Sequence, residues 1–242
     1  MKIGVVQIKP IAGNLDANIK RHVELVKAAI EAEANLIYFP ELSVTGYEPC
    51  LSRAMATSES DKRFNIFQEI SDTYGVTIGI GVPLIENNHT LIGMVWFQAN
   101  QTRTSYSKQI LHFDETSIFV SGNKQLILEK EGYCVAPAIC YESLQPEHSI
   151  QAINLGANIY LASVAKSSEG IEKAMQYFPE LARKKGIFIT MANCIGPCED
   201  FFSVGNSAVW GTDGRLLGQL GSETEGIIIV DVETSNTVTQ KI

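Results

Sequence analysis

Three residues that can take part in covalent chemistry, Glu41, Lys108 and Cys140, each come just after an apolar, strand-like stretch. The ends of strands are where α/β enzymes commonly carry catalytic side chains. A thiol has an ordinary pKa of about 8.5, so Cys140 needs a base or a cation beside it to attack at neutral pH. Apolar surroundings raise the pKa of a carboxylate, which suits Glu41 as the base, and Lys108 can supply fixed positive charge. Together the three residues predict a nucleophilic cysteine.

Each of these residues, taken alone, also has an ordinary structural explanation. A free cysteine is usually a small buried hydrophobe, a loop glutamate is usually solvated, and a lysine usually lies on the surface. His148, eight residues after Cys140, offers a second hypothesis in which a Cys–His pair does the chemistry. Because His148 lies at a predicted helix start, an exposed helix position is favoured for it instead.

The motifs around the three residues resemble those of the nitrilase superfamily of carbon–nitrogen hydrolases. The glutamate motif is Phe39–Tyr47 (FPELSVTGY), the lysine motif Tyr106–Lys108 (YSK) and the cysteine motif Ala138–Ser143 (AICYES). Their order and wide spacing match that family. The opening segment Ile3–Gln7 and the later segment Gly205–Gly214 resemble its first strand and its C-terminal pattern, so the resemblance covers nearly the whole chain.

The resemblance implies a catalytic triad in which Glu41 is the base, Lys108 stabilises the oxyanion and Cys140 is the nucleophile. It further implies a second glutamate near the lysine. Glu115, in the segment HFDE, takes that role, and the adjacent Asp114 competes for it. Such a carboxylate would orient Lys108 or a substrate amine. The reaction implied is hydrolysis of a small amide-like substrate by water through a thioester, with no metal and no organic cofactor.

Four further residues are candidates for substrate binding. Tyr47 and Asn193 are pocket residues by family analogy. Tyr141 would offer its backbone N–H to the oxyanion. Glu142 follows the nucleophile by two residues and can contact substrate or water, although a structural hydrogen bond is an equal alternative for it.

The sequence departs from the family pattern in loops that line the pocket. Gln109–His112 replaces a His-Leu pair after the lysine, Ser121-Gly122 stands for the usual Pro-Gly, and Ser163–Lys166 lacks an aromatic-rich run. The resemblance therefore implies the reaction class, an amidase-type hydrolase, and leaves the substrate open. A hydrolase of nitriles or carbamoyl amines, and a non-catalytic metabolite-binding or scaffold protein of the same fold, remain as alternatives.

Strand-like and helix-like segments alternate along the chain, which predicts an α/β fold. Helices are expected from Asn14 to Ala34, over residues 61–74, over Pro146–Leu155, and over residues 169–185 with a bend or restart at Pro179. A hairpin is expected around Asn87-Asn88, and Ser203–Trp210 is expected as one strand. The nitrilase resemblance implies a four-layer αββα sandwich of two mixed sheets with helices outside. No composition break divides the chain, so one domain over residues 1–242 is expected.

Composition narrows the possible partners. The formal net charge of −8 and the pI of about 5.1 argue against nucleic acid. No transmembrane or signal-peptide pattern occurs, and five cysteines in a chain of 242 residues indicate free thiols in a reducing, cytoplasmic setting. Cys194 and Cys198 have no second Cys/His pair nearby, so a zinc site is not expected. Family members commonly pair, which implies a homodimer or higher homo-oligomer.

Overall fold

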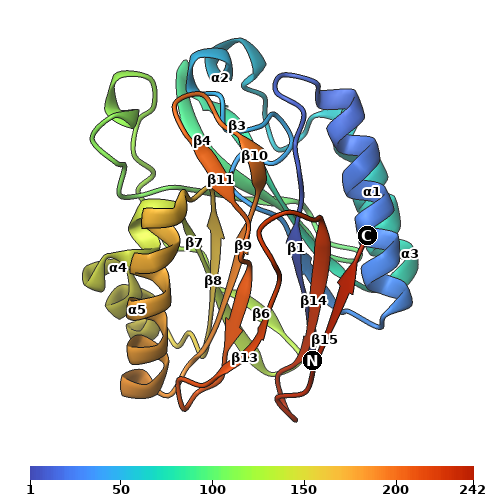
Figure 1. The fold of residues 1–242 in the computed structure, drawn as a ribbon. Coiled ribbons are helices and arrows are strands. Elements are labelled where there is room, and N and C mark those ends of the chain that lie inside the picture. The colour runs from blue at the N-terminus through green and yellow to red at the C-terminus, as the bar shows by residue number, and fades with distance from the viewer.

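The computed structural model describes residues 1–242 and contains two large mixed β-sheets packed face to face (Figure 1). The first sheet has the order β15-β14-β1-β2-β3-β4-β5, with β1, β2 and β3 parallel and the other neighbours antiparallel. Its strands are β1 (Lys2–Gln7), β2 (Leu36–Tyr38), β3 (Thr77–Glu86), β4 (His89–Phe97), β5 (Thr104–Ser107), β14 (Gly226–Asp231) and β15 (Thr237–Lys241).

The second sheet has the order β13-β12-β9-β8-β7-β6, with β7, β8 and β9 parallel. Its strands are β6 (Leu128–Lys130), β7 (Tyr133–Ile139), β8 (Ile159–Val164), β9 (Phe188–Asn193), β12 (Ala208–Trp210) and β13 (Leu216–Gln219). A separate two-stranded ribbon is formed by β10 (Ile195–Pro197) and β11 (Phe202–Val204).

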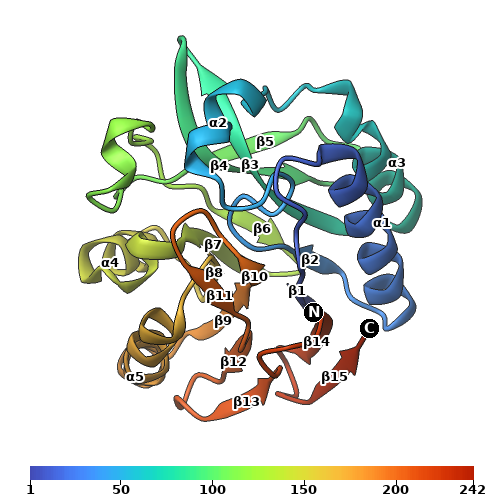
Figure 2. The same ribbon diagram turned by 45° about the horizontal axis from the view of Figure 1, so that its top comes forward.

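Helices cover the outer face of each sheet, as Figure 2 shows with α4 and α5 on one side and α1 and α3 on the other. The α-helices are α1 (Leu15–Glu31), α2 (Pro49–Met55), α3 (Asn65–Tyr74), α4 (Pro146–Asn154) and α5 (Ser168–Lys185). Short 3₁₀ helices are η1 (Lys62–Phe64), η2 (Glu115–Ser117) and η3 (Cys140–Leu144). The predicted four-layer αββα sandwich is confirmed. None of the helices combines the length and the apolar character that a membrane span requires.

Three hydrophobic cores separate the four layers. Along β1, Ile3 and Val5 enter the core between the sheets, while Val6 enters the core beneath α1 and α3. Both faces of this strand are covered, which explains why it reads as a continuous apolar run rather than an alternating one. A third core lies between the second sheet and α5, where Phe178 packs against Trp210. Each such large buried side chain contributes about 1.5–3 kcal/mol to folding.

Two buried hydrogen bonds cross between the sheets near the ends of β2 and β8. The Tyr38 hydroxyl lies 2.8 Å from Thr190 Oγ1 of β9, and the Ser163 hydroxyl of β8 donates to the Phe39 carbonyl at 2.9 Å. These contacts fix the first sheet against the second just before the chain reaches residue 41. The two sheets therefore have a defined alignment at the edge where the candidate residues emerge.

Local sequence signals explain most of the element boundaries. Asn14 accepts a hydrogen bond from Ala17 N at the start of α1, as a helix cap does. The predicted hairpin is confirmed: Asn87 and Asn88 join β3 to β4 with φ values of 50° and 64°, a conformation that asparagine tolerates. Helix α5 ends at Gly186 in the left-handed conformation.

One boundary prediction is wrong. Ser203–Trp210 is not one strand, because Gly205 and Asn206 adopt left-handed φ values of 60° and 58° and separate β11 from β12. Of the bend or restart expected at Pro179, the restart does not occur, because α5 continues as one helix through that residue. The short elements α2, β6, β10 and β15 were not predicted.

Candidate active site

Glu41, Lys108 and Cys140 converge at one edge of the molecule from three strands of two sheets. Glu41 lies in the turn after β2 and Lys108 follows β5, both strands of the first sheet, whereas Cys140 directly follows β7 of the second sheet. The turn that holds Glu41 is fixed to β3, because Phe39 N donates to Gly79 O and Val44 N donates to Gly81 O. The site therefore forms only where the two sheets meet.

Lys108 is the centre of a buried ion-pair network. Its Nζ lies 2.9 Å from Glu41 Oε1 and 2.6 Å from Glu115 Oε1, and all three side chains are almost completely buried. Glu115 also accepts hydrogen bonds from the Tyr47 hydroxyl at 2.9 Å and from His112 N at 2.8 Å. The geometry thus gives Glu115 the position predicted for the second glutamate. Its competitor Asp114 is exposed and pairs with His112 instead.

The surroundings of Glu41 suit a proton acceptor that returns the proton later. Burial raises the pKa of its carboxyl, and the Lys108 charge only partly offsets that effect. Burial alone would lower the pKa of Lys108, but the charges of Glu41 and Glu115 reverse this and keep the ammonium protonated. Glu41 Oε2 is buried and has no hydrogen-bond partner, so one lone-pair direction is open for a proton.

Cys140 occupies a strained position at the junction of β7 and η3. Its φ is 49°, in the left-handed region that non-glycine residues rarely adopt. The thiol points toward Ala165, whose carbonyl oxygen lies 3.5 Å from Sγ. Burial and the nearby Glu41 charge raise the pKa of this thiol to about 12. The resting thiol is therefore protonated, and attack requires transfer of its proton to a base.

Of the two alternatives for Glu142, the structure shows the structural hydrogen bonds and not the contact with the substrate cavity. Its carboxylate is fully buried and accepts hydrogen bonds from Ile139 N at 2.7 Å, Gln109 N at 2.6 Å and the Tyr106 hydroxyl at 2.7 Å. Burial raises its pKa to about 7 despite these donors. The residue joins the segment after Lys108 to the turn at Cys140 and does not line the cavity.

Asn193 is also structural rather than a pocket residue. It is fully buried at the end of β9, where its side chain accepts from Lys166 N at 2.9 Å and donates to Gly205 O at 2.7 Å. It therefore holds together two loops that approach the cavity. The expectation that it contacts substrate is corrected, because neighbouring backbone and hydroxyl groups take up its amide.

His148 is buried rather than exposed, which corrects that prediction. Its Nδ1 lies 2.7 Å from the Tyr160 hydroxyl and its Nε2 lies 2.7 Å from the Tyr106 hydroxyl. Burial lowers its pKa to about 4, so the ring is neutral at ordinary pH. Because both ring nitrogens are taken by tyrosines, the hypothesis of a Cys140–His148 pair has no support in the structure.

A cavity of about 690 Å³ opens beside the nucleophile and contains three of the predicted side chains together with Cys140: Tyr47, Glu115 and Tyr141. Lys166 also lines this cavity, and the sequence reasoning did not single it out. A signal for it existed, because Lys166 stands just after the apolar strand β8, as Lys108 does after β5. No group of His, Cys, Asp and Glu side chains is arranged to hold a metal ion.

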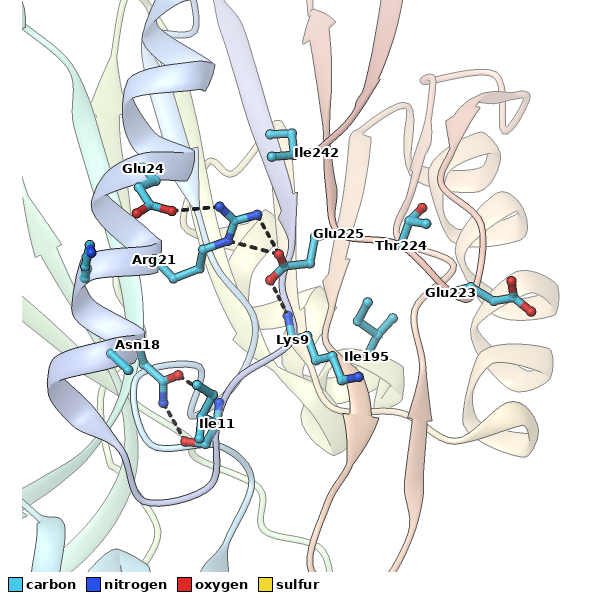
Figure 3. Close-up of a pocket in the computed structure, with 12 residues that line it drawn as sticks. Lys9, Ile11, Asn18, Arg21, Glu24, Ile195, Glu223, Thr224, Glu225 and Ile242 are labelled. Atoms are coloured by element: carbon cyan, nitrogen blue, oxygen red, sulfur yellow. Dashed lines mark hydrogen bonds and ion pairs between the residues drawn. The ribbon is translucent and has the colours of Figure 1, made fainter.

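A second hollow, of about 580 Å³, lies between α1 and the segment before β14 (Figure 3). The positive charge of Arg21 in this hollow is neutralised by ion pairs with Glu225 at 2.6 Å and with Glu24 at 2.7 Å. No cysteine lines it. The cavity beside Cys140 is therefore the candidate active site.

Comparison with known proteins agrees with this geometry. The family model described as carbon-nitrogen hydrolase matches residues 2–241. The chain belongs to this family. An amidase from Nesterenkonia sp. AN1 shares this nitrilase-superfamily fold, with a TM-score of 0.87, 26% identity and coverage of 96% of this chain and 92% of that one. Structures of that amidase include a glutamate variant with acrylamide added at the active site cysteine and a cysteine variant in complex with butyramide.

Curated relatives of this carbon–nitrogen hydrolase carry two kinds of name. The glutamine-dependent NAD(+) synthetase of Acinetobacter baylyi is 27% identical over 232 residues, which cover 93% of this chain but only 42% of that protein. A probable nitrilase of Schizosaccharomyces pombe is 24% identical, with 96% of this chain and 88% of that protein covered. The chain thus spans less than half the length of the synthetases that it matches.

Proposed function

We propose that this carbon–nitrogen hydrolase cleaves a small amide through a thioester on Cys140. The observation that carries the proposal is the arrangement at Lys108, whose ammonium joins two buried carboxylates while Glu41 Oε2 stays free of any partner near the thiol. Likeness to an amidase whose structures include an active-site cysteine adduct and an amide complex supports the same chemistry.

The proposed reaction begins with proton transfer from Cys140 Sγ to Glu41. The thiolate attacks the amide carbon and forms the C–S bond, and the carbonyl oxygen becomes an oxyanion. Lys108 Nζ and the backbone N–H of Tyr141 stabilise that charge, and each good donor contributes about 3 kcal/mol to such a transition state. Glu41 returns its proton to the nitrogen, the C–N bond breaks, and ammonia or an amine leaves.

Hydrolysis of the thioester completes the cycle. Glu41, again ionised, takes a proton from a water molecule, which attacks the acyl carbon. The tetrahedral intermediate collapses, the C–S bond breaks and the sulfur regains the proton from Glu41. Glu115 holds Lys108 in place throughout, because its carboxylate is itself fixed by Tyr47 and His112. The products are a carboxylic acid and ammonia or an amine.

A panel of small amides, ω-amides, carbamoyl amines and nitriles, with glutamine included, tests the proposal by ammonia release. We expect turnover of at least one amide, loss of that turnover in Cys140→Ala, and an acyl adduct on Cys140 detectable by intact-protein mass spectrometry. Cys50→Ala is the matched control, because Cys50 is an exposed free cysteine that does not line the cavity. Ammonia release that persists in Cys140→Ala would contradict Cys140 as the nucleophile. No release across the whole panel would contradict the proposal and favour a binding protein.

A further inference from the structure

Lys166 places an unpaired positive charge in the wall of the active-site cavity. It follows β8 and lines the same cavity as Cys140. Only 5% of the residue is exposed, yet its ammonium makes no hydrogen bond and no ion pair. The residue lines the cavity, and its ammonium has no protein partner, so it is available to an opposite charge that enters there.

The backbone of Lys166 is held rigidly on both sides of its Cα. Its N–H donates to Asn193 Oδ1 at 2.9 Å, and its carbonyl oxygen accepts from Val204 N and from Ser203 Oγ, each at 3.2 Å. The stem of the side chain passes over Gly170, where an added Cβ would lie 3.1 Å from Lys166 Cβ. The lysine is therefore a fixed part of the cavity wall rather than a mobile surface residue.

The position is close to the reacting sulfur. Cys140 Sγ lies 3.5 Å from the carbonyl oxygen of Ala165, the residue just before Lys166. The positive charge of Lys166 also lowers the pKa of Cys140, although burial and Glu41 dominate and raise it. A substrate that is joined to Cys140 would thus extend past the Lys166 ammonium.

The other basic side chains around this cavity already have acidic partners. Lys173 pairs with Glu169 at 2.7 Å, and the His112 ring lies 2.6 Å from Asp114. The remaining acidic residue of the rim, Asp200, is exposed. Lys166 is the one cation of the wall without a partner. A single ammonium among several rim carboxylates suits a singly charged carboxylate better than a doubly charged phosphate.

We propose that Lys166 binds a carboxylate on the acyl part of the substrate, so that the substrates are monoamides of dicarboxylic acids rather than neutral aliphatic amides. This inference rests on the proposed amide hydrolysis and assigns its substrate class. Lys166 then determines specificity and leaves the proton transfers to Glu41. The N-terminus of α5, which begins beside Lys166 with its cap at Ser167, adds positive potential on the same side.

The kinetic test compares succinamate with succinamide, which differ only in carrying a carboxylate or a second amide. We expect kcat/KM of the wild type to be about tenfold to a hundredfold higher for succinamate than for succinamide, the usual range for one charged hydrogen bond. The value for succinamide is first halved, because that substrate has two equivalent amides. In Lys166→Met the ratio should fall to near one, mainly through KM. Lys166→Arg keeps the charge and should retain part of the preference.

Lys184→Met is the matched control, because Lys184 is an exposed lysine of the same helix that follows Lys166 and lies outside the cavity. Its succinamate to succinamide ratio should equal that of the wild type. A wild type without a preference for succinamate would overturn the inference. So would a Lys166→Met variant that loses activity on both amides by the same factor, because Lys166 would then serve the reaction itself.

Binding to the inactive Cys140→Ala protein separates this inference from the proposed function. Calorimetry should show tighter binding of succinamate than of succinamide, and the difference should vanish in Cys140→Ala/Lys166→Met. If no amide is turned over but this contrast is present, the hydrolase proposal fails and the carboxylate site stands. If neutral amides are turned over and the contrast is absent, only the assignment to Lys166 fails.

Discussion

Glu41 and Glu115 share one ammonium but differ in what surrounds them. Glu115 accepts from Lys108, Tyr47 and His112, so its carboxylate is saturated with donors. Glu41 accepts a hydrogen bond only from Lys108, through Oε1, and its Oε2 has no hydrogen-bond partner. Two carboxyl groups in unlike surroundings divide the roles of orienting group and base, as paired acids do in other enzymes.

Replacement of Glu41 by glutamine should make the Cys140 thiol unreactive. The thiol has a pKa near 12 and therefore depends on a neighbouring base, and glutamine keeps the shape of that base without its function. General-base catalysis typically contributes about 10²–10⁴-fold, so iodoacetamide labelling of Cys140 should slow by at least about a hundredfold. Peptide mass spectrometry measures the rate, and the exposed Cys50 gives an internal reference.

An unchanged labelling rate in Glu41→Gln would show that another group activates the thiol. Equal labelling of all five cysteines in the wild type would contradict the assignment of Cys140 as nucleophile. His148→Gln is a further comparison: because His148 contacts tyrosines rather than the thiol, labelling of Cys140 should continue at the wild-type rate.

For single residues, the sequence predicted the candidates that directly follow strands. It did not predict the roles of residues that depend on which groups surround them in the folded interior. Glu41, Lys108 and Cys140 were found because each leaves an apolar run at a strand end. His148 is buried against the prediction, and the role of Glu142 stayed open, because the groups around both come partly from distant segments such as Tyr106. Lys166 was overlooked although it obeys the same rule as Lys108.

Among the elements, the turn after β2 determines where Glu41 lies. It packs directly on β3, and the point of contact is Gly81. A Cβ at this position would lie 2.2 Å from Pro40 O and 2.7 Å from Leu42 N. Only a residue without a side chain lets the turn approach so closely. The packing of the turn on β3 therefore determines the position of Glu41.

Gly81→Ala should therefore displace the turn and damage both folding and activity. Overpacking of this kind typically costs about 1–3 kcal/mol, which urea denaturation would detect, and the shift of Glu41 should lower kcat more than KM. Gly221→Ala is the control, since nothing lies within 4 Å of an added Cβ there. Equal stability and activity in the two variants would mean that the turn is free to relax.

Element boundaries were predictable where capping and periodicity act locally. Helix α1 with its Asn14 cap and the Asn87-Asn88 hairpin follow from neighbouring residues alone. The strands β6 and β10 have three residues each, too few for a periodic pattern to appear. The break between β11 and β12 depends on Gln7, which accepts from Ser207 N across the fold.

The whole molecule brings the site together by packing two sheets that contribute different members of it. Alternation of helices and strands predicted an α/β fold, but not which sheet faces which. That information lies in contacts distant in sequence, such as Tyr38 with Thr190, 152 residues apart. The four-layer arrangement was reached through the resemblance of the motifs, and local pattern alone would have left it open.

Stability of the whole molecule should depend on pH through His22 of α1, which contacts the turn that holds Glu41. Its Nδ1 contacts Asn18 O at 2.7 Å and its Nε2 contacts Ser43 Oγ at 2.9 Å. Burial lowers its pKa from 6.5 to about 4. Below pH 6.5, His22 is protonated in the unfolded chain but stays neutral in the folded protein until the pH reaches about 4. The stabilisation that is present above pH 6.5 is therefore lost as the pH falls toward 4.

We expect the unfolding free energy to fall over this interval, with His22 contributing up to roughly 3 kcal/mol. Urea denaturation at a series of pH values measures the effect. His22→Gln should reduce the pH dependence, whereas the exposed His89→Gln should leave it unchanged. Equal slopes in the wild type and His22→Gln would contradict the assignment. Part of the slope should persist in His22→Gln, because the pKa of the buried His148 is also lowered to about 4.

The left-handed backbone at Cys140 sets folding against reactivity at a single residue. For a residue with a side chain this conformation costs about 1–2 kcal/mol, and glycine would remove the penalty. Replacement of Cys140 by glycine would thus remove the nucleophile and at the same time stabilise the fold. Selection for stability alone would therefore favour loss of the Cys140 thiol. Engineering that aims to stabilise the protein should leave position 140 unchanged.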